Sequence, residues 1–411
     1  MRSRAGAGLL VVMLGLAVTV TLGLVEKSPC ASGNWGDLRQ YRLLCYSDIV
    51  PLYGTESLQG GRLPYIDECT PGVNGVCDEY PVLTMYAMRV AAWPVSTTAG
   101  FFYANVILLV AAAIATAYAL WRLAGRRALY FALAPTMLIY GFVNWDLIAV
   151  AFAATATYAF VKRRNTLAGV LLGLGAAAKF FPALLVVPFV AERLRKKDRA
   201  GAIDVLWWSV VAWLAVDLPF IILAPHPWSG FFRFNAHRVT DFDSLWFIVC
   251  NHLHRGPCGN TNLVNKVSLL AFVAAAGLVW VLKVRRHPDT PRWQLGFPIL
   301  VAFLLANKVY SPQYSLWLIP WFALALPDLR WFLAFEAADV AVFVTRFAWF
   351  GSFSGSQNGW TNGVTYTYFE VALLARAAVL IGCVFAFLLR APPRRAEERM
   401  PVEPQAEAMA A

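Results

Sequence analysis

The sequence predicts an all-α polytopic membrane protein, and three observations carry that prediction. Hydrophobic residues make up 59% of the 411 residues, charged residues make up only 14%, and the mean hydropathy is +0.57. Soluble domains contain about a quarter charged residues, so this chain could not cover a soluble surface of its size. Apolar windows long enough to cross a bilayer recur along the whole chain. The same composition excludes intrinsic disorder and fibrous structure.

The apolar segments fall into a strong and a weak group, and together they predict a bundle of about 10–12 transmembrane helices. The strong group comprises 9–25, 101–121, 202–224, 264–282, 331–350 and 369–389. The weaker and shorter group comprises 128–143, 146–161, 165–178, 180–192, 294–306 and 314–327. We expect one membrane domain over 1–390 and a disordered cytoplasmic tail over 391–411. The run 9–25 resembles a signal peptide, but without a cleavage context we expect an uncleaved span.

Basic residues set the orientation of these spans. The net charge is +11, but most Lys and Arg residues cluster between apolar segments, so the charge does not indicate nucleic-acid binding. If every segment crosses, all the clusters fall on one side, and the positive-inside rule makes that side cytoplasmic. Both termini are then cytoplasmic, in a multi-pass protein of the cell membrane. The segments 26–100, 225–263 and 351–368 are extracytoplasmic, and the first of these is the largest.

The cysteines support this orientation. Six of the seven fall on the predicted outer side, which is the oxidising one. Two equal spacings predict the disulfides Cys69–Cys77 and Cys250–Cys258, which leaves Cys30 and Cys45 as the third pair by elimination. Because His252 and His254 lie between Cys250 and Cys258, a zinc site is the alternative there. We favour the disulfide and expect no metal.

The short segments predict a recess in the outer half of the membrane. Residues 128–161 lie between two basic clusters and must therefore cross outward and return. Two helices of about 16 residues each reach only ~24 Å, which is less than the ~30 Å hydrocarbon core. The hairpin 165–192 is shorter still. Irregular backbone at membrane depth needs protein or water around it, so these re-entrant-like turns predict a cavity lined by Asn144, Trp145, Asp146 and Lys179.

Two acidic residues of the first outer segment are candidates for catalysis. Asp48 lies among Tyr46, Ile49 and Val50, just before a proline, and such surroundings suit a general base better than a solvated loop charge does. Glu79 precedes a proline and an apolar stretch, 81–93, which we expect to form a helix along the membrane surface.

Cations of the later segments are candidates for binding an anion. Arg233 and His237 share a helix face if their segment is helical, and with Arg238 they suit an anionic lipid head group. The alternative is an interfacial helix with snorkelling side chains. Lys308 lies with Tyr310 and Gln313 in the outer turn of the hairpin 294–327, so it joins Lys179 at the recess.

Asp339 and Arg376 lie at similar depths in two predicted spans. We expect a structural ion pair between them. A proton-coupled transporter would use the same pair as a proton relay.

Taken in order along the chain, these motifs resemble the GT-C membrane glycosyltransferases, and most closely glycosyltransferase family 87. The resemblance covers nearly the whole chain. The six outer cysteines are not part of that family's pattern. The motifs are Ser47-Asp48-Ile49, Gly61-Arg62-Leu63-Pro64-Tyr65, Glu79-Tyr80-Pro81, Asn144-Trp145-Asp146, Gly173 with Lys179-Phe180-Phe181-Pro182, and Lys308-Val309-Tyr310-Ser311-Pro312-Gln313-Tyr314.

The resemblance implies a GT-C-like bundle that transfers a sugar, mannose in the family's known members, from a polyprenyl phosphate to a glycolipid or glycan of the cell envelope, with inversion. Asp48 would be the general base and Glu79 would orient substrate. The implied substrate- and phosphate-binding residues are Lys179, Lys308, Arg233, His237, Arg238, Asp146, Tyr310 and Gln313. No cofactor is implied, and the glycine-rich nucleotide-binding motifs are absent from the sequence. The rival interpretations are a transporter or lipid-linked-saccharide flippase, and a non-catalytic assembly protein.

Overall fold

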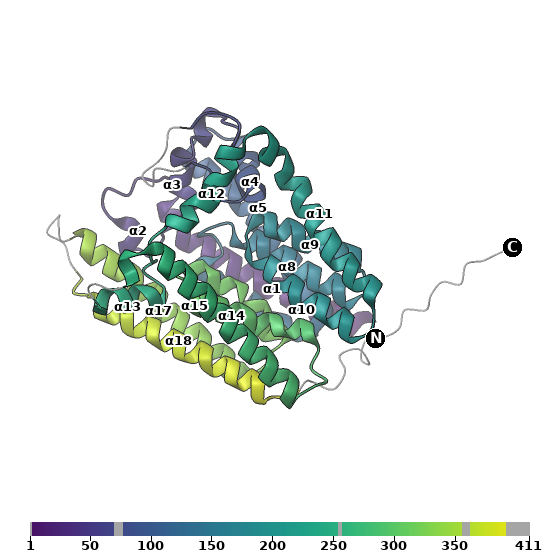
Figure 1. Ribbon diagram of the computed structural model, residues 1–411. Helices are drawn as coiled ribbons and strands as arrows, with labels where there is room; N and C mark the ends of the chain where they lie inside the picture. Colours follow the sequence, from purple (N-terminus) through teal and green to yellow (C-terminus); the bar gives the residue numbers. More distant parts are fainter. Residues whose placement is uncertain (1, 70–76, 254–256, 356–361, 392–411) are drawn as a thin grey trace.

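The predicted all-α membrane architecture is confirmed. The computed structural model describes residues 2–69, 77–253, 257–355 and 362–391, and within these ranges every regular element is a helix. The predicted tail beyond residue 391 lies outside the described residues, as does His254. The helices form one bundle, capped at one end by the segments around α3, α4 and α12 (Figure 1).

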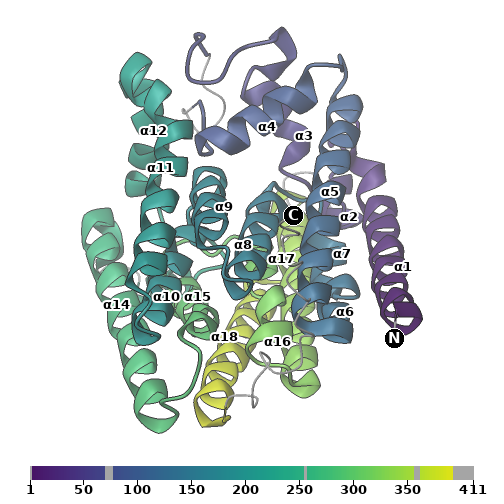
Figure 2. The same ribbon diagram turned by 90° about the vertical axis from the view of Figure 1, so that its right-hand side faces the viewer.

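Five helices of the described chain are long and apolar enough to cross a bilayer. They are α1 (Arg2–Lys27), α5 (Thr98–Ala124), α11 (Arg199–Leu223), α14 (Thr261–Arg286) and α18 (Tyr366–Leu389). The sixth strong segment forms α17 (Leu329–Gly355), which is equally long but carries Glu336, Asp339 and Arg346 and is not among the five. The start of α1 and the end of α18 lie at the end of the bundle opposite to α3, α4 and α12 (Figure 2).

The predicted short helices form inside the bundle. They are α8 (Asp146–Val161), α9 (Asn165–Ala178), α10 (Phe181–Arg195) and α15 (Gly296–Ala306), the last preceded by the 3₁₀ turn η5 (Arg292–Leu295). α9 packs closely on α11, and glycine makes that approach possible. A Cβ on Gly173 would lie 2.2 Å from the Ser209 carbonyl oxygen, so no other residue fits there without moving α11.

Two of the expected short helices are broken, and in these places the prediction of a continuous helix was wrong. The segment 128–143 forms the 3₁₀ turn η3 (Gly125–Ala128) and then α6 (Leu129–Ala132) and α7 (Pro135–Tyr140). The segment 314–327 forms η6 (Pro312–Trp317) and α16 (Ile319–Leu324). Each second piece begins at or next to a proline, Pro135 or Pro320, where the missing N–H and the ring prevent a continuous helix.

The first of the segments predicted to be extracytoplasmic, 26–100, forms a folded cap. It contains η1 (Ser28–Cys30), α2 (Arg39–Arg42), α3 (Ile49–Thr55), η2 (Leu58–Gly60) and α4 (Val82–Ala92), and the last of these confirms the helix predicted over 81–93. A buried ion pair holds its middle together, with Arg62 Nη2 2.7 Å from Asp78 Oδ2. The Glu56 carboxylate accepts hydrogen bonds from the backbone N–H groups of Asp78 and Glu79 at 2.8 and 3.1 Å.

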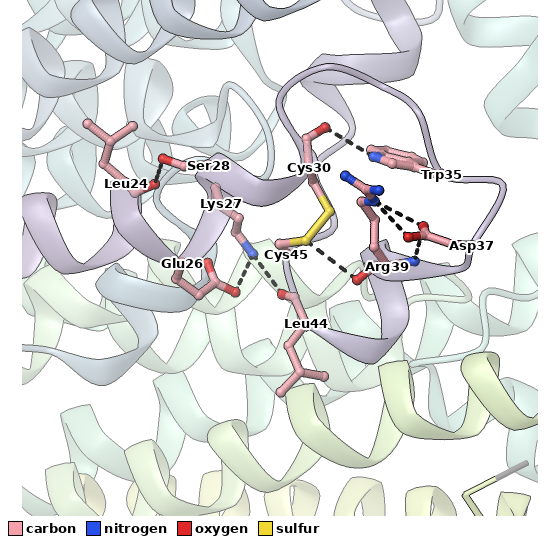
Figure 3. The surroundings of a disulfide bond; sticks show 10 residues. All are labelled: Leu24, Glu26, Lys27, Ser28, Cys30, Trp35, Asp37, Arg39, Leu44 and Cys45. Carbon is pink, nitrogen blue, oxygen red and sulfur yellow. Dashed lines mark hydrogen bonds and ion pairs between the residues drawn. A yellow bond between two sulfur atoms is a disulfide. The ribbon is translucent and has the colours of Figure 1, made fainter.

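All three predicted disulfides are present: Cys30–Cys45, Cys69–Cys77 and Cys250–Cys258. The second lies in the cap, and the third joins α13 (Leu245–Leu253) to η4 (Pro257–Gly259). Figure 3 shows the first of them, which closes the loop after α1, with Lys27 reaching the Glu26 carboxylate and the Leu44 carbonyl beside it. This disulfide fixes the chain just before Asp48.

Candidate active site

A cavity of about 910 Å³ lies beneath the cap. Its wall comes from several separate parts of the chain: the cap around Asp48 and Glu79, the turn 140–144, residues 179–181, the end of α12 (Pro225–His237) with residues 238–241, and the turn 307–314. α17 closes it with Arg346 and Phe347. The recess predicted from the short hairpins is therefore present, with Asn144 and Lys179 in its lining, but Trp145 and Asp146 are buried and do not line it.

Six of the predicted site residues meet at this cavity: Asp48, Glu79, Lys179, Arg238, Lys308 and Gln313. Asp146 and Tyr310 lie buried directly behind its wall. Arg233 and His237 do not line it. The predicted helix α12 confirms that they share a face, and His237 Nδ1 lies 2.8 Å from the Arg233 carbonyl oxygen. Arg233 is exposed and donates to the Ser229 hydroxyl and the His226 carbonyl.

One wall of the cavity carries the carboxylates, and it is attached to the turn after α7. The backbone N–H of Asp48 donates to the Val143 carbonyl at 2.8 Å, and Ser47 Oγ donates to the Phe142 carbonyl at 2.7 Å. The Asp48 side chain is half-buried, and its oxygens accept hydrogen bonds from Tyr46 and Asn144. Glu79 is also half-buried and lines the same cavity. The two carboxylates named as catalytic candidates thus share one space.

Four cations line the same cavity and form its cationic wall: Lys179, Arg238, Lys308 and Arg346. Most of them have a carboxylate partner. Lys179 Nζ lies 3.0 Å from Asp146 Oδ2, and the rings of Tyr80 and Tyr314 lie 5.2 and 5.0 Å from the same nitrogen. Arg238 pairs with Asp241 at 3.0 Å.

Arg346 pairs with Asp243 at 2.7 Å, and Asp243 is fully buried. In each of these pairs the charge of the cation is largely matched by the protein itself.

Lys308 differs from these cations. Its ammonium group donates to the Ala236 carbonyl at 3.2 Å, and among the residues that the structure describes no carboxylate lies within ion-pairing distance of it. The residue is only 4% exposed. Burial, together with the nearby Arg238 guanidinium, lowers the pKa of Lys308 to about 8. A buried cation without a counter-charge is stabilised by any anion that enters the cavity.

A second, apolar groove of about 470 Å³ adjoins the cavity between α9, α10, α11 and α12. Its lining is mostly aliphatic and aromatic, with Leu172, Val187 and Trp213 as examples. The two spaces share part of their lining: Pro81, Phe180, Phe231 and Phe232. Because Phe180 directly follows Lys179, a molecule in the groove can reach the cationic wall.

The comparison with known families decides the class of protein. The model of glycosyltransferase family 87 matches residues 80–312, more than half of the chain. The chain belongs to glycosyltransferase family 87. The matched range includes Tyr80, Asn144, Lys179, Arg238 and Lys308. It begins one residue after Glu79, so Asp48 and Glu79 both lie outside it. No curated protein matches the chain.

Membership of glycosyltransferase family 87 makes this protein a membrane glycosyltransferase with donor and acceptor substrates. The ion pair expected between Asp339 and Arg376 is confirmed at 3.2 Å. Both side chains are fully buried, and neither lines the cavity or the groove. Arg376 also stacks over the Tyr310 ring, 3.8 Å from its centre, so Tyr310 helps to join α17 and α18 instead of facing the cavity.

Sequence reasoning missed several residues of this glycosyltransferase site. Arg346, Asp241 and Asp243 were not singled out, although a cation inside a predicted span is itself a signal. Tyr46, Tyr80 and Asn144 appeared only as neighbours of acids, in motifs or as part of the recess, and were given no role of their own. The available clue was that each lies close in sequence to a predicted site residue. Tyr46 lies two residues before Asp48, Tyr80 directly follows Glu79, and Asn144 lies two residues before Asp146.

Proposed function

We propose that this glycosyltransferase transfers a sugar from a polyprenyl-phosphate donor to a glycolipid or glycan of the cell envelope, on the outer face of the cell membrane, with inversion and with Asp48 as general base. Mannose is the sugar that the family resemblance implies. The observation that carries the proposal is the junction of two spaces. A cavity with an uncompensated buried cation opens into an apolar groove across the Phe180 side chain.

The cationic wall suits the phosphate of such a donor. Lys308 lacks a carboxylate partner in the described chain, and Lys179 and Arg238 line the same cavity. A phosphate held there would be compensated most by Lys308, because the other two cations already have acids beside them. As the bond to the sugar breaks, negative charge grows on the leaving phosphate, and fixed cations in a water-poor site stabilise that charge.

The groove suits the lipid part of the donor. A polyprenyl chain is a long branched hydrocarbon, and burying it stabilises the complex by about 25 cal/mol for each Å² of apolar surface. From a phosphate at Lys179 or Lys308, the chain would pass Phe180 and enter the groove lined by α9, α10, α11 and α12. A nucleotide-linked sugar has no use for such a groove, which supports a lipid-linked donor.

Asp48 would act on the acceptor. In an inverting transfer, the acceptor hydroxyl attacks from the side opposite to the leaving phosphate, and a base on that side takes its proton. Asp48, on the carboxylate wall, and the cations line the same cavity, so a base and a phosphate site would share one space. Glu79, on the same wall, would hold a second hydroxyl and so orient the substrate.

The remaining predicted residues take supporting roles in this proposal. Asp146 holds Lys179 in place, and Trp317 Nε1 donates to the same carboxylate at 2.7 Å. Gln313 lines the cavity as a neutral hydrogen-bonding group. Arg233 and His237, on the exposed side of α12, would contact anionic lipid head groups at the membrane surface instead of the reacting phosphate.

The direct test is transfer by the purified protein in lipid nanodiscs, supplied with radiolabelled polyprenyl-phosphate mannose and extracted envelope glycolipid. We expect a labelled glycolipid to form, and no product with a nucleotide-linked sugar. Label that crosses the bilayer of a proteoliposome without being transferred would favour the flippase instead. Addition of EDTA should leave the rate unchanged, since the sequence predicts no metal dependence.

A further inference from the structure

The carboxylate of Asp48 is held at both oxygens. Tyr46 Oη donates to Oδ1 at 2.7 Å, and Asn144 Nδ2 donates to Oδ2 at 2.8 Å. The first donor lies two residues before Asp48, and the second lies in the turn between α7 and α8, 96 residues further along. Two parts of the chain therefore meet at this one side chain.

Asn144 is itself fixed, and its neighbours determine which way its amide faces. Its Oδ1 accepts the backbone N–H of Trp145 at 2.6 Å, so the oxygen is occupied and Nδ2 must face Asp48. The indole of Trp145 in turn donates to Asn105 Oδ1 at 2.6 Å, which ties the turn to α5. Asn144 is only 1% exposed. The amide is thus a rigid hydrogen-bond donor.

The second N–H of this amide has a partner too. Asn144 Nδ2 donates to Tyr80 Oη at 2.7 Å, so the Tyr80 hydroxyl acts as an acceptor there and must direct its own hydrogen elsewhere. Tyr80 lines the cavity. This arrangement aligns Asp48, Asn144 and Tyr80 along one wall without using up the second lone pair of either Asp48 oxygen.

We propose that Asn144 and Tyr46 are positioning residues, which hold the Asp48 carboxylate in a single orientation so that its remaining lone pairs meet the acceptor hydroxyl. This inference rests on the proposed function. One hydrogen bond at each oxygen prevents rotation of the carboxylate group. Orientation of a reacting group within a fraction of an ångström has a large effect on rate.

A merely structural role is a poor account of these two bonds, because other contacts already dock the segment. The Asp48 backbone N–H and the Ser47 hydroxyl bind the carbonyls of Val143 and Phe142. Those contacts need neither the Asn144 amide nor the Tyr46 hydroxyl, so they remain when either is removed. Substitution there should spare the fold and affect the carboxylate.

The test compares Tyr46→Phe and Asn144→Ala in the nanodisc transfer assay, with thermal unfolding measured on the same preparations. Tyr46→Phe removes a single oxygen, so it carries the test even if Asn144→Ala fails to fold. For each folded variant we expect kcat to fall about 10-fold, as for one hydrogen bond to a charged group, while donor KM stays the same.

Tyr41→Phe is the matched control. Its ring stacks beside that of Tyr46, with centroids 6.4 Å apart, but its hydroxyl interacts with Gln40 and it does not line the cavity. It should leave kcat and donor KM unchanged.

If Asp48→Asn is inactive while Tyr46→Phe and Asn144→Ala keep a normal kcat, the positioning role is wrong and the proposed function stands. The same conclusion follows if kcat falls only in proportion to the loss of folded protein. If Asp48→Asn itself transfers sugar, the proposed function fails first, and the positioning role fails with it.

Discussion

The two walls of the cavity are built on different electrostatic principles. On the carboxylate wall, Asp48 is held by neutral donors, Tyr46 and Asn144, and no cation of the described residues forms an ion pair with it. On the cationic wall, Lys179, Arg238 and Arg346 each lie against an acid. Lys308 is the exception, and it is held by a carbonyl. The sign of its charge alone therefore does not mark a side chain as functional. A charged side chain without an ion-pair partner is the better candidate.

This comparison predicts its largest effect at Asp48. Asp48→Asn keeps the shape and the possibility of hydrogen bonding but removes the base, so transfer should fall by about 10²–10⁴-fold. Glu79→Gln should have a milder effect, because orientation is lost but the base remains. Single-turnover assays with labelled donor measure both. If Glu79→Gln abolishes transfer while Asp48→Asn is nearly normal, the two roles are reversed.

The two lysines sharpen the comparison. Lys308→Met removes an uncancelled charge, so donor affinity should fall about 10–100-fold, as for a hydrogen bond to a charged group, with little change in stability. Lys179→Met leaves Asp146 buried with its cation removed, which typically costs about 3–5 kcal/mol of folding stability. Donor binding and thermal unfolding of the two variants separate these effects. Equal loss of stability in both would contradict the distinction.

The groove offers a way to test the lipid part separately. Val187→Trp should fill part of a space lined by apolar side chains and so raise the KM for a long polyprenyl donor by about 10-fold, which corresponds to the loss of about two buried methylene groups. A donor with a short prenyl chain should be affected little. Leu282→Trp, on the exposed face of α14, is the matched control. If short and long donors suffer alike, the groove does not hold the chain.

Titration of Lys308 predicts a smaller, pH-dependent effect. Its pKa is lowered to about 8 by burial and by Arg238, so below pH 8 the ammonium form that binds phosphate prevails, and above it this form is lost. The phosphodiester of the donor stays charged throughout. Donor KM should therefore rise as the pH increases beyond about 8. Lys308→Arg should shift this rise to higher pH, and an unaltered profile in that variant would assign it to another group.

The smallest expected effect concerns the cap. Replacing both Cys69 and Cys77 by Ser removes a cross-link over 8 residues, which should lower stability by about 2–3 kcal/mol and reduce transfer only modestly, since neither residue lines the cavity. The same cysteines test the topology. After mild reduction, an impermeant thiol reagent should label them in intact cells, and labelling only after lysis would place the cap in the cytoplasm.

Much of the fold was predictable because it depends on patterns that are local in sequence. Apolar length gave the helices, cysteine spacing gave the disulfides, and the short span of 128–161 gave the recess. The helix breaks at Pro135 and Pro320 were not predicted, although a proline marks each of them. The segments were identified from hydropathy averaged over many residues, and one proline hardly changes that average. A contact between two distant segments could be predicted only where the depth of each residue in its span could be counted along the sequence. The ion pair of Asp339 and Arg376 is the example.

The site was predictable as a set of residues but not as an arrangement. Asp48, Glu79, Lys179 and Lys308 were named and do meet at one cavity. For Arg233 the sequence left two outcomes open, an anion site and an interfacial helix, because a helix of mixed composition does not reveal which face turns inward. The exposed side chain agrees with the second. That Lys179 has an acid and Lys308 does not is set by contacts between elements more than 30 residues apart, and spacing along the chain carries no such information.

The division of labour between the two walls is tested most directly by measuring donor binding and single-turnover transfer on the same preparations of Asp48→Asn and Lys308→Met. Binding of labelled polyprenyl-phosphate sugar to protein in nanodiscs gives Kd, and rapid quenching gives the transfer rate. We predict that Asp48→Asn binds donor with unchanged Kd but does not transfer, and that Lys308→Met binds more weakly. Normal transfer by Asp48→Asn, or unchanged Kd in Lys308→Met, would contradict the account.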